Sequence, residues 1–517
     1  MKAEELSQAY KAADAALLKT PSADVIRLTR ELEELRVKSE IAADEILRHS
    51  GLSDEEIRLI KESNDQSGPP RVDELWRADI LKQEPSEDLD DLLESALDNL
   101  LGTVDLKWLR AESERPHGLG EDYRAHPLHL VNGVRVGEAP ETGGPNRFAR
   151  MLLLSLKHLG KHDDLDFFSA STFLPEIATL GNSLREIREL GPEAIRKLAS
   201  LREVPDEQVT STIYELLVGA AWVRRGHSIT MVPEDKSKKV PDFLVSGMAF
   251  PGAVECKRRL GLSKYELDEA KHVSEFYREI RHPLRAHGMN LSIEAAFGAE
   301  LREISKADFA ENVLKTAFQR AWDEQVKADW GTYTVRQLHS YKSVIDTRLY
   351  SPDFLQSAFS WEHDQDEWDG LLCEVEAPTE IRVSRFRSPL CLKWRSDSET
   401  ALLKKSRGVL SLWADAVKQV PAGTIGFVYI AYPEGSRAAV ADTRTRDIIQ
   451  ELEGCWHNWT KRVPVTVVNR LYARPLGVGV PDMIENTLRG ATEGEEFWYT
   501  DIRIPSLIFT RQFENQD

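Results

Sequence analysis

The feature that most constrains the fold is a change of pattern near residue 205 of this 517-residue chain. Beyond it, short runs rich in Val, Ile, Phe and Tyr alternate with segments whose apolar residues recur every three or four positions. This alternation predicts an α/β domain with a central mixed sheet. The expected strands are Ser228–Val232, Phe243–Val245, Ala253–Lys257, Leu291–Phe297, Thr332–Arg336, Gly426–Ala431 and Val463–Leu471. The expected helices are Glu207–Arg225, Lys264–Glu279, Lys306–Val326, Thr400–Val420 and Thr443–Leu452.

The part of the chain before residue 205 has a helical pattern instead. Helices are expected at Glu4–Leu18, Ala23–Leu47, Glu84–Leu101, Arg147–Leu159 and Leu184–Leu201. A run of Ser, Asn, Gly and Pro at 63–70 is typical of a linker. We therefore predict N-terminal helices at 1–62 and a mostly helical accessory or regulatory region at 63–204. The α/β domain then covers 205–480, with an insertion at about 337–394, and a C-terminal extension covers 481–517.

Composition narrows the class of protein. Hydrophobic residues make up 41% and charged residues 30% of the chain, which is typical of a soluble protein with a sizeable core. No apolar run approaches the ~20 residues that a membrane span needs. The first residues are polar and acidic, so no secretory leader is expected. The cysteines are far apart, which favours a reducing, cytoplasmic location over a disulfide framework or a structural zinc site. They are Cys256, Cys373, Cys391 and Cys455.

The net charge of −19 counts against a protein that coats DNA, because nonspecific affinity for DNA comes from neutralising phosphates. A local site for a ligand that carries phosphate is still compatible with this charge. A small basic groove on an acidic body attracts phosphate locally, and a bound metal adds its own positive charge.

One acid stands out within the expected helix Glu207–Arg225. This helix is apolar nearly all round, so we expect it to be buried. Glu215 lies in its middle, on the face that carries Val218, Gly219 and Trp222. A buried carboxylate is costly unless it is paired, hydrogen-bonded or bound to a metal. Glu215 is therefore a candidate site residue, although a simple ion pair would also explain it.

Two further carboxylates and a lysine follow on adjacent strands. Asp242 begins one strand, and the next strand carries Glu255 and Lys257. Because side chains alternate along a strand, Glu255 and Lys257 point one way while Cys256 points into the core. A hairpin brings Asp242 to the same end as Glu255. Such carboxylates supply hard oxygen ligands for Mg²⁺ or Mn²⁺, which activates water and polarises a phosphodiester, while Lys257 orients or deprotonates the water.

With Pro241-Asp242 and Glu255-Cys256-Lys257 after the Glu215 helix, the sequence resembles the PD-(D/E)XK nuclease superfamily over about residues 207–279. The resemblance implies a restriction-endonuclease-like fold, a mixed β-sheet flanked by helices. It implies a Mg²⁺-dependent endonuclease, with Mn²⁺ as a substitute and with DNA more common than RNA as substrate. Family members serve in restriction, phage defence, repair and transposition. Asp242 and Glu255 would bind the metal, and Glu215 would hold a second metal or orient the first.

Four further residues are weaker candidates for contact with nucleic acid. Arg258 and Arg259 would bind the phosphates next to the scissile bond, or they would form a solvated edge without contact to nucleic acid. Lys239 lies in a basic loop, and Gln419 lies at the end of a helix where family members sometimes place an assisting residue. A solvated helix end is the alternative for Gln419.

Several alternatives stay open at this point. The Glu–Lys pair could belong to an ordinary surface hairpin, since Pro-Asp recurs at Pro205-Asp206, Pro352-Asp353 and Pro481-Asp482. The substrate could be RNA, or the fold could bind nucleic acid without cutting it. A scaffold protein that works through its helical N-terminus is a further alternative, and a homodimer or a regulatory partner at these helices is a hypothesis.

Overall fold

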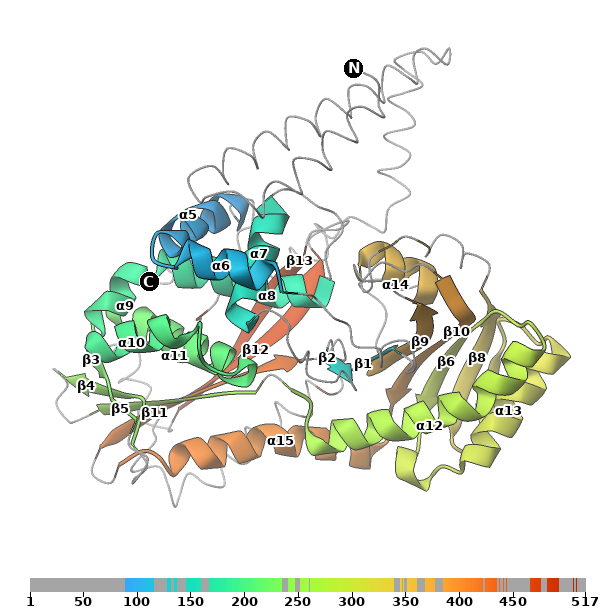
Figure 1. Ribbon diagram of the computed structural model, residues 1–517. Helices are drawn as coiled ribbons and strands as arrows, with labels where there is room; N and C mark the ends of the chain where they lie inside the picture. The colour runs from blue at the N-terminus through green and yellow to red at the C-terminus, as the bar shows by residue number, and fades with distance from the viewer. Residues whose placement is uncertain are drawn as a thin grey trace, which may run out of the picture.

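The architecture comes from a computed structural model. It describes residues 89–115, 128–131, 134–136, 146–159, 167–234, 240–246, 252–259, 261–338, 345, 347, 351–359, 368–376, 385–421, 424–434, 437, 440, 443, 465–475, 481–491, 505 and 508. The predictions for the N-terminal helices at 1–62 and for Lys239 lie outside these residues. The described strands form two mixed sheets with helices packed against both, so the chain is a mixed α/β protein (Figure 1).

The first sheet has six strands in the order β13-β12-β11-β5-β4-β3. Neighbours β3, β4 and β5 are antiparallel, whereas β5, β11 and β12 run parallel, and β13 pairs antiparallel with β12. The strands are β3 (Ser228–Met231), β4 (Phe243–Ser246), β5 (Gly252–Arg258), β11 (Ile425–Glu434), β12 (Val465–Pro475) and β13 (Pro481–Ala491). Strand β5 therefore lies inside the sheet, with neighbours on both sides.

Helices cover both faces of this sheet. On one face α11 (Asp206–Arg224) packs against Val254 and Cys256 of β5 and against the same side of β11. On the other face α15 (Glu399–Val417) packs against Val428 and Ile430 of β11. Figure 1 shows α11 above the sheet and α15 below it. The two layers explain why alternate residues of β5 meet different surroundings.

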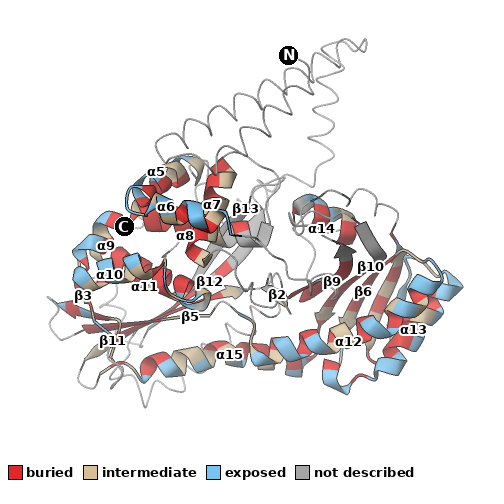
Figure 2. Cartoon of the chain, in the orientation of Figure 1, coloured by how far each residue is buried: buried red, intermediate tan, exposed pale blue. Residues whose placement is uncertain are grey.

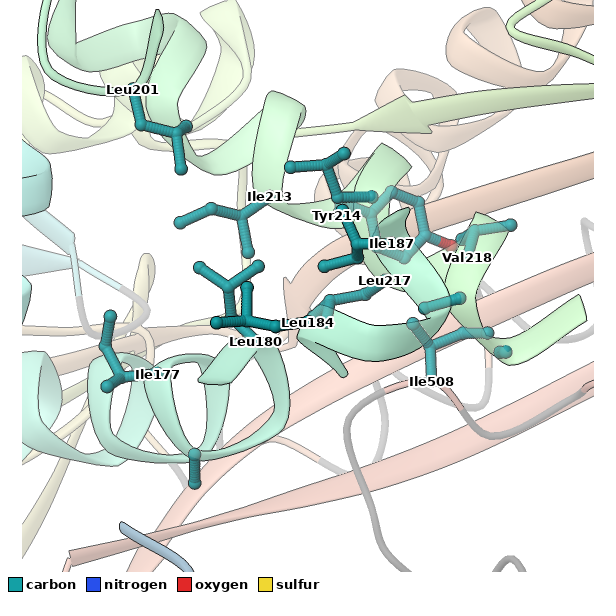
Figure 3. Close-up of a cluster of buried hydrophobic side chains, with 14 of the residues drawn as sticks. Ile177, Leu180, Leu184, Ile187, Leu201, Ile213, Tyr214, Leu217, Val218 and Ile508 are labelled. Carbon is teal, nitrogen blue, oxygen red and sulfur yellow. The ribbon is translucent and has the colours of Figure 1, made fainter. Parts of the chain in front are cut away.

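The helices before residue 205 share the core of the first sheet. Figure 3 shows side chains of α8, α9 and α11 converging on one buried cluster, to which Ile508 also belongs. The prediction of a separate accessory region at 63–204 therefore differs from the structure, in which these helices form one layer with α11. They are α5 (Leu89–Leu101), α6 (Leu106–Ser113), α7 (Arg147–Leu159), α8 (Phe167–Asn182), α9 (Leu184–Glu189) and α10 (Pro192–Ser200).

The second sheet has seven strands in the order β2-β1-β9-β10-β6-β8-β7. Only β10 and β6 are parallel among its described pairs. Helices α12 (Lys264–Ala286) and α13 (Lys306–Gln319) bury their apolar faces against it, and α14 (Pro352–Phe359) lies near β10. The strands are β1 (Leu128–Val131), β2 (Val134–Val136), β6 (Leu291–Phe297), β7 (Gln325–Ala328), β8 (Gly331–Gln337), β9 (Gly370–Glu376) and β10 (Arg385–Ser396).

This second sheet changes the predicted domain boundaries. The described elements between β5 and α15, from α12 to β10, form one body around the second sheet, so the insertion is larger than the predicted 337–394. Strands β1 and β2, from the predicted accessory region, complete its far edge. The C-terminal extension predicted at 481–517 begins instead as β13, a strand of the first sheet.

Two predicted helices are shorter in the structure, for local reasons. The segment 184–201 divides into α9 and α10 because Gly191, with φ of 100°, precedes Pro192. Helix α13 ends at Gln319 because Arg320 takes a left-handed conformation, and Val326 belongs to β7. Of the predicted helix at 443–452, only residue 443 lies within the described residues.

The buried residues follow the layered arrangement of helices and sheets. In Figure 2 the buried residues lie between helices and sheets, and the exposed ones cover the outer sides of α12 and α13. No helix in the described part of the chain combines the length and the apolar character needed to cross a membrane.

Candidate functional site

Strand β5 presents its residues to two different layers. Val254 and Cys256 belong to the core under α11. Glu255 and Lys257 pair in register with Val428 and Ile430 of the parallel strand β11, whose side chains face α15. In-register neighbours on parallel strands project to the same face, so Glu255 and Lys257 lie on the α15 side of the sheet.

Asp242 is held against β5 by backbone contacts. Phe243 pairs with Val254, so the preceding residue, Asp242, lies across from Glu255. Its Oδ2 accepts a hydrogen bond of 2.7 Å from the backbone N–H of Cys256, and its carbonyl oxygen accepts one of 2.8 Å from the N–H of Val232. These two bonds fix the carboxylate beside the strand that carries Glu255 and Lys257.

Glu255 is the most buried acid of the group, with none of its surface exposed. Its Oε1 accepts a hydrogen bond of 2.5 Å from Lys257 Nζ. Its Oε2 is buried and has no hydrogen-bond partner among the described residues. A carboxylate oxygen removed from water without a partner is costly, so an unpaired oxygen at this position favours a ligand that would supply the missing contact.

Glu215 reaches the group from α11, in the opposite layer. A Cβ added at Gly219, one turn along the helix, would lie 2.7 Å from the Phe243 ring. The glycine therefore lets α11 approach the start of β4, and so Asp242, closely. Glu215 Oε2 lies 2.6 Å from Nζ of Lys197 on α10, and that ammonium lies 3.4 Å from Glu234 Oε1.

Burial and mutual repulsion shift the protonation of these acids. Burial raises the pKa of Asp242 well above its ordinary value, and the negative charges of Glu215 and Glu255 raise it further. Burial also raises the pKa of Glu255 to about 7, although Lys257 acts in the opposite direction. The pKa of Lys257 is raised because Glu255 outweighs the opposing effect of burial, so this lysine carries a proton at neutral pH.

We call these five residues, Asp242, Glu255, Glu215, Lys257 and Lys197, the acidic site. Three carboxylates face two ammonium groups, so one negative charge remains when all are ionised. Excess negative charge at buried hard oxygen atoms suits a small divalent cation such as Mg²⁺ or Mn²⁺. The donor set thus fits the metal that the sequence analysis predicts.

The number of protein ligands would be small. Within the described residues, no group of three or more His, Cys, Asp and Glu side chains is arranged to hold a metal ion. Asp242 and Glu255 lie across from each other on neighbouring segments, so this pair is the candidate for holding one. Mg²⁺ commonly binds through one or two carboxylates and completes its shell with water and substrate oxygens.

Two of the residues predicted to contact nucleic acid, Arg258 and Arg259, form ion pairs with acidic side chains of the protein itself. Arg258 points to the α11 side, where its guanidinium pairs with Glu176 of α8 and donates to the Thr210 carbonyl. Its side chain is only 1% exposed, so it has no access to a phosphate, and the predicted contact is wrong for the structure as described. The guanidinium of Arg259 lies 3.6 Å from Glu266 of α12 and is 15% exposed.

Gln419 lies just after the end of α15, and β11 then begins beside Gly252. From Gly252 the strand spans about 10 Å to Glu255 and about 17 Å to Lys257, at about 3.3 Å per residue. The described hydrogen bond of Gln419 runs from its backbone N–H to the Ala416 carbonyl, within the end of the helix, so no described contact joins Gln419 to the acidic site.

Lys197 is the site residue that the sequence analysis missed. It precedes Glu215 by 18 residues and lies on a different helix. Nothing in its local pattern distinguishes it from other lysines on α-helices. Only the packing of α10 on α11 shows that its side chain, 12% exposed, is directed inward.

Comparison with known proteins adds no further guide to the site. The sequence matches no protein-family model, and no curated protein matches it.

Proposed function

We propose that this chain is a metal-dependent nuclease of the PD-(D/E)XK type that hydrolyses phosphodiester bonds in DNA. The observation that carries the proposal is the unpartnered, buried Oε2 of Glu255, which lies across from Asp242 and beside Lys257. A surface hairpin with a Glu–Lys pair would leave its carboxylate in water. Glu255 is fully buried instead, and its neighbours are charged.

The connection of the elements supports the same proposal. Helix α11 precedes the hairpin of β3 and β4, then β5 with Glu255 and Lys257, then α15 and the parallel strand β11. The order helix, strand, hairpin and E-x-K strand is the one the resemblance implies. The helix expected next, at 264–279, is α12, which packs on the second sheet, so α15 takes its place on the first sheet. In this chain the second sheet is inserted between the E-x-K strand β5 and helix α15.

Each residue then has a chemical task. Asp242 and Glu255 would hold the divalent cation, which when bound supplies a polarised phosphate and a more acidic water. The Cys256 N–H fixes the Asp242 carboxylate, so the pair is already positioned before substrate arrives. Lys257 places a positive charge next to Glu255, where it would orient the attacking water or offset charge that develops on the phosphate.

The test is a cleavage assay on plasmid DNA, linear duplex DNA, single-stranded DNA and RNA, with Mg²⁺, Mn²⁺ or EDTA. We expect metal-dependent cutting by the full chain. Lys257→Ala and Asp242→Asn should each reduce the rate by about 10²–10⁴-fold, the usual contribution of a positioned catalytic group.

Lys418→Ala serves as the matched control, because Lys418 forms an exposed pair with Asp415 at the far end of α15. Its rate should stay within about twofold of wild type. Cutting that persists in both site variants would place the active site elsewhere. Cutting restricted to RNA would keep the site and change the substrate, whereas binding without cutting on all four substrates would contradict a catalytic role.

A further inference from the structure

Lys197 places an ammonium group beside Glu215, the third carboxylate of the acidic site. Its Nζ lies 2.6 Å from Glu215 Oε2 and 3.4 Å from Glu234 Oε1, and its side chain is 12% exposed. Glu215 is the third carboxylate of the acidic site and is close enough to Asp242 for the two charges to interact. Without Lys197, the site would have three carboxylates and only one cationic side chain.

We propose that Lys197 makes this a one-metal site, by occupying Glu215 so that only Asp242 and Glu255 are left to bind an ion. This inference rests on the proposed function and concerns the number of ions it uses. Glu215 then acts as a positioning residue: it anchors Lys197 near Asp242 and is not itself a metal ligand. The ammonium group of a lysine is a compact point charge, so it can supply part of the positive charge that a second metal ion would supply.

The charge balance supports this assignment. Among the five residues of the acidic site, without the exposed Glu234 that Lys197 also meets, one negative charge remains, which one divalent ion more than offsets. A second divalent ion would leave the buried group strongly positive before any phosphate arrives. If Lys197 lost its charge, two negative charges would remain, so two divalent ions would leave two positive charges where wild type would have three. Glu215 would also be released as a ligand beside the other two acids.

The experiment is Mn²⁺ binding to the full chain, measured by isothermal titration calorimetry. Wild type should bind one Mn²⁺ per chain, and Lys197→Gln should bind two. The double variant Lys197→Gln with Glu215→Gln should return to one, because the second ion depends on the released carboxylate. Arg196→Gln is the matched control: it removes the same charge from the next residue of α10, whose side chain is 70% exposed and pairs with Glu193. It should bind one ion.

A second measurement needs no variant and so does not depend on how well Lys197→Gln folds. Two ions in one site lie about 3.5–4 Å apart. Their spins would then couple, so electron paramagnetic resonance of Mn²⁺ bound to wild type separates one ion from two. We expect the spectrum of an isolated ion.

The outcomes distinguish this inference from the proposed function. A coupled pair of ions in wild type, or one ion in Lys197→Gln, would overturn the inference and leave a metal-dependent nuclease intact. Wild type that binds no Mn²⁺ would overturn the proposed function, and the inference with it.

Discussion

Among the buried charged side chains that the structure describes, two groups differ in whether their charges cancel. The first is the acidic site on the first sheet. The second, which we call the buried ion cluster, consists of Glu269, Asp369, Lys405 and Arg437. Lys405 Nζ lies 2.8 Å from Asp369 and 3.1 Å from Glu269, and Arg437 lies 3.0 Å from Asp369. Its two acids and two bases balance, and all four side chains are between 1% and 3% exposed. Arg437 also pairs, at 2.6 Å, with Asp397, whose side chain is partly exposed.

The residues of the buried ion cluster come from both bodies of the molecule. Glu269 belongs to α12 and Asp369 precedes β9, so both belong to the second body. Lys405 belongs to α15, and Arg437 follows β11, so both belong to the first. The cluster therefore joins the two bodies by ion pairs closed to solvent. The acidic site differs in keeping an excess negative charge and a lysine, Lys257, that is 27% exposed.

The comparison also shows that a shifted pKa alone does not identify a functional site. Burial raises the pKa of both Glu255 and Glu269 to about 7, against the opposing charges of Lys257 and Lys405 respectively. Charge balance and access to solvent separate the two groups. These are the properties that a site must have to admit an ion and a substrate.

The largest effect on stability should come from breaking the buried ion cluster. Lys405→Ala leaves Asp369 and Glu269 without their shared partner, so we expect the free energy of unfolding to fall by about 3–5 kcal/mol. Urea denaturation measures this loss. The control Lys418→Ala removes one member of an exposed pair and should cost less than about 1 kcal/mol. A loss as small as the control's would mean that the cluster does not hold the two bodies together.

A smaller effect of opposite sign should come from the acidic site. The pKa of Glu255 is about 7 in the fold against an ordinary 4.5, so unfolding releases a proton between these pH values. The fold therefore loses stability as pH rises from 4.5 to 7, and the full penalty persists above 7. Glu255→Gln should remove this penalty. We expect it to stabilise the metal-free protein above pH 7 by up to about 3 kcal/mol, and to lose that advantage toward pH 4.5.

Glu300 provides a control with the opposite sign. Although burial opposes it, hydrogen bonds from Lys404 and Arg302 hold the pKa of Glu300 below its ordinary value. Its ionised form therefore stabilises the fold above the ordinary pKa, and Glu300→Gln should destabilise the protein at neutral pH. Thermal unfolding across pH 4–8 compares the two variants. If Glu255→Gln were destabilising at pH 8, the pairing of Glu255 with Lys257 would outweigh the cost of burial, and the raised pKa of Glu255 would be contradicted.

Local features of the site follow from the sequence, because they depend on strand alternation. Placing Val254 and Cys256 on one face and Glu255 and Lys257 on the other needs only the period of a β-strand. The mixed sheet with flanking helices follows from the alternation of apolar patterns after residue 205. Strands β3 to β6, β8 and β11 match the predicted segments within a few residues.

Features that depend on distant packing did not follow from the sequence. Lys197 enters the site only because α10 packs on α11. Arg258 is buried because α8 brings Glu176 to it from 82 residues away, and no local pattern predicts this pair. The second sheet includes β1 and β2, which come from a region that was expected to be helical. These strands have only four and three residues, so their alternation is too short to be detected in the sequence.

The central claim is that Asp242 and Glu255 together bind a divalent cation, and anomalous X-ray diffraction from crystals containing Mn²⁺ tests it most directly. We predict one anomalous peak per chain, bound by Glu255 Oε2 and an Asp242 oxygen, that disappears in Asp242→Asn. Crystals with no peak at these oxygens, or with a peak that persists unchanged in Asp242→Asn, would contradict the account.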